Sequence, residues 1–291
     1  MTRSCVICME KISKISAKAV LSPWIRQLGI KQRISNFLKC PNCGLGFFSY
    51  RYIDEEMYCI YRDYRGERYV AIRNHWEPWY DFNYNSNHDN ESWVSMRIDA
   101  LTDFINKFEL KPDVVVDVGG DRGQYIPNLG QEVSIVIDTS NKEPVKGVIM
   151  KSSLDEVHKS DLIFLSHVLE HVANPVATLK ELFLYSNTIY VEVPYGVPEI
   201  SKKRRSKIRF LIKLVSTISP LFWRKFTIPA TGRKSGDGVL IQSEHINFFT
   251  EISLGAIAKM LECKIELEVN EIATPDGNRA RVIQCLLFAG D

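Results

Sequence analysis

Residues 114–123 read Val-Val-Val-Asp-Val-Gly-Gly-Asp-Arg-Gly, an apolar run that ends in a carboxylate and a glycine-rich turn. A run of β-branched residues predicts a fully buried strand in a parallel sheet. The turn after Asp117 contains Gly119, Gly120 and Gly123, and residues without a Cβ let the backbone approach a ligand closely. We therefore expect a ligand at the carboxyl end of this strand.

A second apolar strand is expected at Val133 to Ile137, and it also ends in a carboxylate, Asp138. Asp138 follows Asp117 by 21 residues. At about this spacing in open α/β sheets, an acidic residue at the end of the next strand binds ribose hydroxyls. The two strands predict an α/β fold with a nucleoside-bearing cofactor; the alternative is an ordinary strand and tight turn without a ligand.

The charge of the turn distinguishes two classes of cofactor. A dinucleotide site would read G-x-G-x-x-G and place a pyrophosphate at the amino end of the next helix. Asp117 and Asp121 would repel a pyrophosphate, whereas they would attract the sulfonium and α-amino groups of S-adenosylmethionine (SAM). The turn therefore favours SAM over NAD.

Residues 161–175 add a buried strand that runs into Leu169-Glu170-His171, with a helix expected from about Pro175. A fifth strand follows at Ile189–Pro194, and Glu244-His245-Ile246-Asn247-Phe248-Phe249 precedes a helix near Thr250. The order of these motifs over about residues 95–288 resembles the class I SAM-dependent methyltransferases.

The resemblance implies a Rossmann-like sheet that is mostly parallel, with one antiparallel strand. It also implies that SAM is bound at the strand ends, by Asp117, Gly119, Gly120, Gly123, Asp138 and His167. One position departs from the family, because Asp121 stands where members usually have glycine.

The composition is that of a globular protein. The chain has 291 residues, of which 45% are hydrophobic and 25% charged, enough to bury a substantial core. No apolar run reaches transmembrane length, and Met1 to Glu10 lacks the apolar region of a signal peptide. We expect a cytoplasmic protein, because seven cysteines fit reduced thiols and a metal site better than a disulfide framework.

Four cysteines form two C-x-x-C pairs, Cys5 with Cys8 and Cys40 with Cys43. Two such pairs are typical of a structural zinc site, in which four thiolates leave no open position on the ion. The 31 residues between the pairs exceed the usual zinc-ribbon spacing, and we expect a helical insertion over residues 13–37. The alternative is four unrelated buried cysteines.

Tyrosines and arginines alternate over residues 58–80. Such a segment could stack on a sugar or hold a diphosphate through bidentate guanidinium groups. The substrate-binding candidates are Tyr64, Arg65, Arg68, Arg73 and Tyr80. The segment could equally be a packed platform with its charges in solvent, and different residues could serve both roles.

The order of these parts predicts three regions. Residues 1–53 form a zinc-binding module, and residues 54–94 form a connecting and substrate segment. Residues 95–291 form the SAM-binding domain, with a basic cap insertion at 197–240. The combination resembles bacterial methyltransferases of deoxysugar and surface-glycan biosynthesis, among which the nucleotide-sugar C-methyltransferases are the nearest comparison.

This narrower resemblance implies that Glu244, His245 and His171 lie beside the sugar and support proton transfer. Those C-methyltransferases carry a further carboxy-terminal domain that has no counterpart before Asp291. We therefore expect O-methylation of a sugar hydroxyl to be at least as plausible as methylation at carbon.

A histidine suits this proton removal, because its unperturbed pKa of about 6.5 lies near the operating pH. We expect His245, oriented by Glu244, to be the base, and His171 to be the second candidate. His245 could instead cap the loop before the helix near Thr250. His171 could serve the architecture of the cofactor loop, whose turn Glu170 would brace.

Positive charge is concentrated in residues 201–235, which contain eleven lysines and arginines and no acidic residue; the rest of the chain has a net charge of −9. Apolar residues recur there at helical spacing: Ile208, Leu211, Ile212 and Val215. With Trp223 at its tip, this pattern is typical of a helix on an anionic membrane surface, which would suit a lipid-linked glycan.

Other interpretations of residues 201–225 are that their charges bind a nucleotide diphosphate or RNA, or that the helix packs on the domain by its apolar face. Gly232 to Gly238 are expected to form a mobile lid at the site entrance.

We expect a cytoplasmic enzyme, in part at the inner face of the membrane, that uses SAM and a structural zinc ion to methylate a sugar or glycan. One rival is an RNA methyltransferase, although no recognised RNA-binding motif is present. The other is a non-catalytic SAM- or zinc-binding interaction protein, against which the intact motif residues argue.

Overall fold

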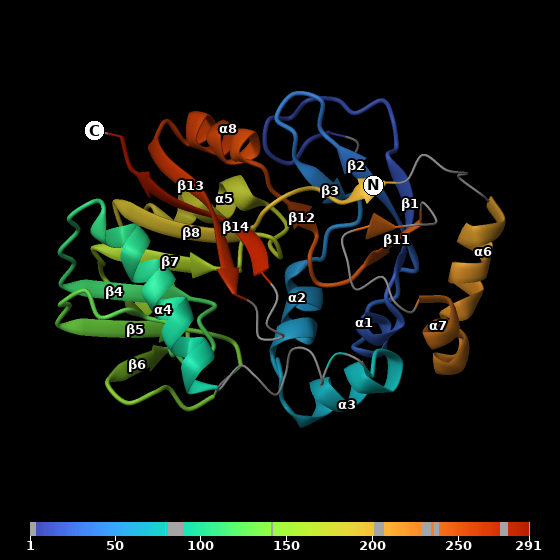
Figure 1. Cartoon of the computed structure of the whole chain (residues 1–291), viewed down its shortest axis with the longest axis horizontal. Coiled ribbons are helices and arrows are strands. Elements are labelled where there is room, and N and C mark those ends of the chain that lie inside the picture. Colours follow the sequence, from blue (N-terminus) through green and yellow to red (C-terminus); the bar gives the residue numbers. More distant parts are fainter. Residues whose placement is uncertain are drawn as a thin grey trace. The chain divides into compact units, whose positions relative to one another are not determined.

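The computed structural model describes residues 4–78, 80, 90–140, 142–200, 207–227, 234–235, 239–273 and 279–290 (Figure 1). The chain divides into two compact units. Unit 1 comprises Met1–Asp81, Glu170–Ala173 and Gly196–Ser253; unit 2 comprises Phe82–Leu169, Asn174–Tyr195 and Leu254–Asp291. The boundaries of these two units differ from those of the three regions expected from the sequence. The three regions remain a prediction.

Unit 2 contains a seven-stranded sheet with the order β13-β14-β8-β7-β4-β5-β6. Its strands are β4 (Val114–Val118), β5 (Val133–Ile137), β6 (Val148–Lys151), β7 (Leu162–Ser166), β8 (Thr188–Pro194), β13 (Lys264–Ala273) and β14 (Arg279–Phe288). The ladders from β6 to β8 are parallel, and β14 runs antiparallel to both neighbours. This confirms the expected Rossmann-like sheet with one antiparallel strand.

The helices of unit 2 begin where the sequence supplies a cap. α4 (Glu91–Asn106) follows Asn90, and α5 (Pro175–Leu182) follows Asn174; each asparagine side chain accepts a backbone N–H of the first turn. α8 (Glu251–Leu261) begins at the end of unit 1 and continues into unit 2. The helices expected near residues 175 and 250 are therefore confirmed.

The core of unit 2 lies between α4 and the sheet, and its buried residues are Leu101, Phe104, Ile105, Val115, Leu162, Phe164, Tyr190 and Leu286. Between β4 and β7 the described residues contain no α-helix, only a short 3-10 helix at Leu154–Glu156. The strands β4, β5 and β6 are joined by loops, and the glycine turn is the first of them.

Unit 1 contains a five-stranded sheet with the order β11-β1-β2-β3-β12. Its strands are β1 (Ala17–Leu21), β2 (Ile34–Lys39), β3 (Gly46–Phe48), β11 (Val239–Gln242) and β12 (Asn247–Phe248). β1 pairs in parallel with β11, whereas the other neighbours are antiparallel. Strands from both ends of the chain thus form one sheet.

The expected helical insertion over residues 13–37 is wrong. The segment contains β1 and much of β2, and its α-helix, α1 (Pro23–Gln27), has only five residues. β1 has a partner strand on each side, and all but one of its side chains are buried. Pairing and burial outweigh the helical spacing, because a short apolar run does not distinguish a helix from a buried strand.

The described residues of unit 1 contain four longer helices: α2 (Asp54–Tyr61), α3 (Glu67–Trp76), α6 (Lys207–Ser216) and α7 (Pro220–Thr227). They share a core cluster that includes Trp24, Tyr52, Tyr69 and Trp223. A short parallel pair, β9 (Glu199–Ile200) and β10 (Lys234–Ser235), completes the unit. No helix in the described part of the chain is long and apolar enough to cross a membrane.

Two details of the basic segment differ from expectation. Trp223 is fully buried, so it is not an exposed aromatic tip. Leu211, Ile212 and Val215 are exposed, so α6 does not pack by the apolar face that the sequence indicates. Residues 201–206, most of the expected lid at 232–238, and the side chain of Ile208 lie outside the described residues.

Candidate functional site

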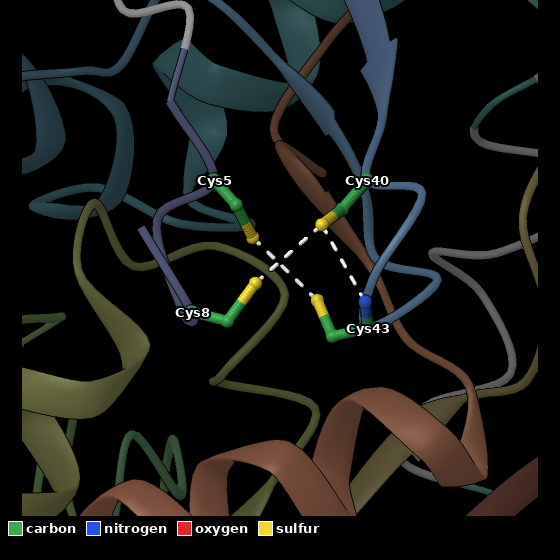
Figure 2. A group of neighbouring side chains, drawn as sticks. All are labelled: Cys5, Cys8, Cys40 and Cys43. Carbon is green, nitrogen blue, oxygen red and sulfur yellow. Dashed lines mark hydrogen bonds between the residues drawn. The ribbon is translucent and has the colours of Figure 1, made fainter. Parts of the chain in front are cut away.

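The two C-x-x-C pairs come together in unit 1 (Figure 2). The four Sγ atoms lie within 4.8 Å of one another, and the Cys5–Cys43 and Cys8–Cys40 distances are each 3.5 Å. Sulfurs bound to one tetrahedral zinc ion would be about 3.8 Å apart, whereas a disulfide would bring two of them to about 2.05 Å. The donor set and its spacing fit a closed zinc site.

Backbone groups support the thiolate form of this cluster. The N–H of Ile7 donates to Cys5 Sγ at 3.4 Å, and the N–H of Cys43 donates to Cys40 Sγ at 3.5 Å. The second pair forms the turn between β2 and β3, which Gly44 closes with φ +75°. The hydrogen bond between the two sulfurs lowers the pKa of the Cys5 thiol to about 5 and raises that of Cys43, because one shared proton leaves one thiolate in the pair.

In unit 2 the glycine turn follows β4. Gly119 has φ +75°, and a Cβ there would lie 2.8 Å from Val168 Cγ2. A Cβ at Gly120 would overlap the carboxylate of Asp117. The backbone of Asp121 is also in the left-handed region, with φ +56°. This conformation explains why glycine suits the position, and aspartate is among the residues that tolerate it.

Three carboxylates gather at the ends of β4 and β5. Asp138 accepts the N–H of Asp121 at 2.9 Å and that of Ser140 at 2.7 Å, while Asp121 pairs with Lys142 Nζ at 2.8 Å. Asp117 is buried, and burial followed by the charges of Asp138 and Asp121 raises its pKa to about 7. A cationic ligand would relieve this repulsion, so the residues fit SAM better than a pyrophosphate.

This arrangement predicts pH-dependent SAM binding. Asp117 is half-protonated near pH 7, and a cation favours its ionised form, so SAM affinity should rise as the pH increases through about 7 and then level off. Titration calorimetry across this range measures the effect. Asp117→Asn should bind weakly at every pH, and Asp113→Asn, at an exposed carboxylate of the same unit, should behave as wild type. A pH-independent wild-type affinity would contradict the prediction.

His167 belongs to a buried network that sequence reasoning missed. It follows β7 with φ +57°, and its Nε2 lies 3.0 Å from Oε1 of Glu192 on β8, which also pairs with Arg97 of α4. Burial alone would raise the pKa of Glu192, but the charges of Arg97 and His167 hold it at about 2. Tyr190 Oη and Gln284 Nε2 donate to its other oxygen at 3.1 and 3.2 Å.

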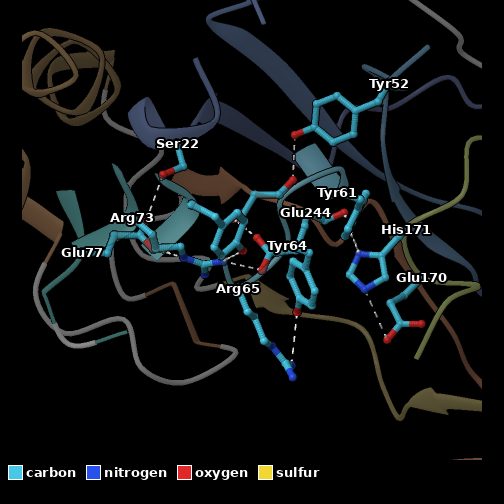
Figure 3. Close-up of polar contacts among 12 residues, drawn as sticks. Ser22, Tyr52, Tyr61, Tyr64, Arg65, Arg73, Glu77, Glu170, His171 and Glu244 are labelled. Carbon is cyan, nitrogen blue, oxygen red and sulfur yellow. Dashed lines mark hydrogen bonds and ion pairs between the residues drawn. The ribbon is translucent and has the colours of Figure 1, made fainter. Parts of the chain in front are cut away.

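Glu244 belongs to an ion-pair cluster in unit 1, in which its side chain is only 12% exposed (Figure 3). Its Oε1 accepts Arg73 Nη1 at 2.6 Å, and the Ser243 hydroxyl donates to its other oxygen. Burial opposes ionisation, but the charge of Arg73, followed by that of His245, holds the pKa of Glu244 at about 2. Glu244 is therefore ionised at neutral pH, where it is a weak base but stabilises positive charge on a neighbouring imidazole.

Arg73 is engaged within the protein. Its guanidinium contacts Glu77 Oε2 at 3.3 Å and Tyr69 Oη at 2.7 Å, in addition to Glu244. Its Cζ also lies 4.4 Å from the ring centroid of Trp24 and 4.1 Å from that of Tyr80. These contacts leave Arg73 little capacity for a substrate diphosphate, and its binding role remains a prediction.

The structure brings the three catalytic candidates together. The rings of His171 and His245 meet edge to face, with centroids 4.7 Å apart. Nδ1 of His171 lies 2.7 Å from Tyr61 Oη and 3.1 Å from the carbonyl oxygen of Glu244 (Figure 3). Burial raises the pKa of Tyr61 well above its usual value, so its phenol stays protonated. Tyr61 is a neighbour of the site that the sequence did not single out.

Arg51, also missed, explains why the two motifs meet. Its guanidinium donates to the carbonyl of Val172 at 2.8 Å, to that of Ile246 at 2.9 Å and to Asn247 Oδ1 at 2.6 Å. The N–H groups of Ile246 and Asn247 donate to the carbonyl of Glu170 at 2.9 and 3.0 Å. The turn at 170–173 is therefore fixed to the strand that follows His245 in the sequence.

The remaining substrate candidates divide into two groups. Tyr64 packs against Tyr61 and Tyr69, with ring centroids 5.5 and 5.2 Å apart, and Arg65 Nη2 donates to Tyr64 Oη at 3.3 Å (Figure 3). Tyr80 is buried in the same cluster, whereas Arg68 is exposed on α3. Their roles toward a substrate remain predictions.

A family model described as a methyltransferase domain matches residues 91–267, more than half of the chain. The chain belongs to this methyltransferase family. Together with the seven-stranded sheet, the match shows a SAM-dependent methyltransferase with the class I fold. No curated protein matches the chain.

The chain is also similar to three solved structures. The N-terminal domain of EvdMO1 with SAH bound is 14% identical over 67% of this chain and 81% of its own, with a TM-score of 0.38. The plantazolicin methyltransferase BpumL with a triazolic desmethylPZN analog and SAH is 15% identical over 76% and 92%, with a TM-score of 0.43. Magnesium protoporphyrin IX methyltransferase (ChlM) from Synechocystis PCC 6803 with SAH is 11% identical over 66% and 83%, with a TM-score of 0.39.

Proposed function

We propose that this methyltransferase methylates a sugar, linked to a nucleotide or a lipid, in surface-polysaccharide or deoxysugar biosynthesis. The observation that carries the proposal is the cluster in which an ionised, largely buried Glu244 lies next to His245, whose ring contacts that of His171. A hydroxyl acceptor needs such a cluster because its proton must leave as its oxygen attacks.

SAM, when bound, supplies the methyl group. In the proposed reaction, the imidazole of His245 would accept the proton that the acceptor hydroxyl loses. The carboxylate of Glu244 stabilises the resulting imidazolium, and Arg73 keeps that carboxylate ionised. For a carbon acceptor, the same imidazole takes the proton from the carbon beside a ketone.

Two features support a sugar as the acceptor. Tyr61 and Tyr64 are partly exposed and belong to the same side-chain cluster as His171, so their rings offer apolar faces for stacking on a sugar ring. The imidazoles supply hydrogen-bonding groups for hydroxyls. We also propose that Cys5, Cys8, Cys40 and Cys43 hold a structural zinc ion.

His245→Ala tests the role of the base. Loss of a positioned base should lower kcat about 10²–10⁴-fold, while SAM still binds with wild-type affinity. Release of S-adenosylhomocysteine from a panel of nucleotide sugars and glycan extracts measures turnover.

His158→Ala, at an exposed histidine of unit 2, is the matched control and should keep full activity. Full activity of His245→Ala would contradict the base role but not the sugar. Mass spectrometry of the cell's glycans with and without the protein tests the sugar directly; if every glycan keeps the same methylation, the sugar assignment is wrong.

A further inference from the structure

The helices α6 and α7 present an apolar surface to solvent. Six large apolar side chains between residues 211 and 222 are 40–77% exposed, namely Leu211, Ile212, Val215, Ile218, Leu221 and Phe222. A contiguous stretch of this kind is unusual on a soluble protein and indicates a surface that binds something.

This exposure does not arise from a loosely attached helix. On the opposite side, Phe210 and Leu214 pack against the core cluster of unit 1, and Trp223 is part of that cluster. Lys213 Nζ is buried and donates to the carbonyl of Val239 at 2.8 Å, and Arg224 donates to backbone carbonyls of α3. The helix pair is fixed to unit 1 by one side, which holds its other side outward.

A basic pocket opens at the turn between the two helices. It has a volume of about 360 Å³, and its lining includes Arg26, Gln27, Arg33, Trp76, Thr217 and Ile218. Burial, followed by the neighbouring charge of Arg33, lowers the pKa of Arg26. A phosphate group in the pocket would offset the repulsion between the two guanidinium groups. Ile218 belongs to both the pocket and the apolar surface.

The charge of the surrounding sequence selects the kind of partner. Residues 201–235 contain eleven lysines and arginines and no acidic residue, whereas the rest of the chain has a net charge of −9. Lys213 and Arg224 are engaged with backbone carbonyls, so the attraction of phosphates is left to the others. Exposed apolar side chains within a locally basic segment are suited to the interface of an anionic bilayer. The acyl region accepts the apolar side chains, and the lipid phosphates attract the basic ones.

We propose that the α6–α7 surface binds an anionic phospholipid bilayer, with its apolar side chains in the interface and a lipid phosphate in the Arg26–Arg33 pocket. The protein would then reach acceptors at the membrane. This proposal does not depend on the sugar assignment, because membrane binding is measured without SAM or an acceptor.

The test is co-sedimentation of the full chain with vesicles of phosphatidylcholine alone or mixed with phosphatidylglycerol. The wild-type protein should bind the mixed vesicles. It should bind the neutral vesicles on the order of tenfold more weakly. The double variant Leu221→Glu, Phe222→Glu should lose binding to both. Arg26→Gln with Arg33→Gln should weaken binding to the anionic vesicles alone. The matched control Leu184→Glu, at an apolar residue of unit 2 that is 71% exposed, should bind as wild type.

Failure of wild type to bind anionic vesicles, or equal binding to both kinds, would overturn the proposal. The proposal would also be overturned if light scattering showed that the wild-type protein is a dimer and that Leu221→Glu dissociates it. The surface would then pair two copies of the chain. If inorganic phosphate binds in the pocket and vesicle binding is unchanged, the pocket is a site for soluble phosphate. That result would remove the lipid phosphate from the proposal. Circular dichroism of each variant shows that it is folded.

Discussion

Replacement of Cys43 by serine is expected to remove zinc and to unfold the amino-terminal part of unit 1. Cys43 is buried, and its Sγ lies 3.5 Å from that of Cys5. Structural zinc contributes an apparent ~10–16 kcal/mol in zinc-finger peptides near pH 7, which matches the whole stability of ~5–15 kcal/mol of an ordinary domain. The remaining three thiols would not hold the ion with comparable affinity.

Elemental analysis should find about one zinc per wild-type chain and none in Cys43→Ser. Limited proteolysis should then cleave the variant first within residues 4–48. Cys59→Ser is the matched control, because this thiol is partly buried on α2 outside the cluster, and it should keep both metal and fold. A zinc-free Cys43→Ser protein with wild-type protease resistance would disprove the structural role of the metal.

Arg97→Ala is expected to destabilise unit 2 by about 3–5 kcal/mol, because it leaves the buried carboxylate of Glu192 without its strongest partner. Hydrogen exchange of the β8 and β14 peptides, measured by mass spectrometry, reports this unit separately. The exchange of both strands should accelerate together if the pair stabilises the sheet.

Two comparisons sharpen this prediction. Lys107→Ala breaks the exposed Lys107–Glu268 pair and should cost less than about 1 kcal/mol. Arg97→Met combined with Glu192→Leu removes both charges and should recover most of the lost stability, since Tyr190 Oη still accepts Gln284 Nε2 at 2.8 Å. An Arg97→Ala effect no larger than that of Lys107→Ala would show that the buried pair contributes little.

The same pair sets the response to acid. The pKa of Glu192 is about 2 in the folded protein, below its usual value of 4.5. The stability contributed by its ionised form is therefore fully present above about pH 4.5 and is lost as the pH falls toward 2. In the Arg97→Met, Glu192→Leu variant this part of the acid dependence should be absent.

The sequence was sufficient to predict those helices and strands whose formation depends on neighbouring residues in the chain. Val133–Ile137 forms β5 as expected, and the helices after residues 174 and 250 begin at their predicted positions. Each C-x-x-C pair is a local turn that holds its two sulfurs close, and the two pairs meet as their ligand spacing predicts. The prediction of a helix over residues 13–37 failed because β1 pairs with β2 and with β11, and β11 lies more than two hundred residues away in the chain.

The same distinction applies to the candidate site. His171, Glu244 and His245 were predicted from their motifs, but Arg51 and Tyr61, which contact this part of the chain, carry no motif of their own. The interpretation of Arg73 as a diphosphate ligand depended on its residue type. Its engagement by Glu77 and Glu244 could not be foreseen, because nothing in the sequence shows which carboxylates a buried guanidinium will meet.

By itself, the order of residues determined the nucleotide-binding sheet, its glycine turn and the cysteine pairs, because hydrophobic periodicity, glycine conformations and ligand spacing act within a few residues. The tertiary structure decided which side of α6 faces solvent, which charges are neutralised and which imidazole lies beside an ionised carboxylate. Those properties depend on burial and on charges brought close from distant segments, and electrostatic interactions strengthen only once folding has removed water from around them.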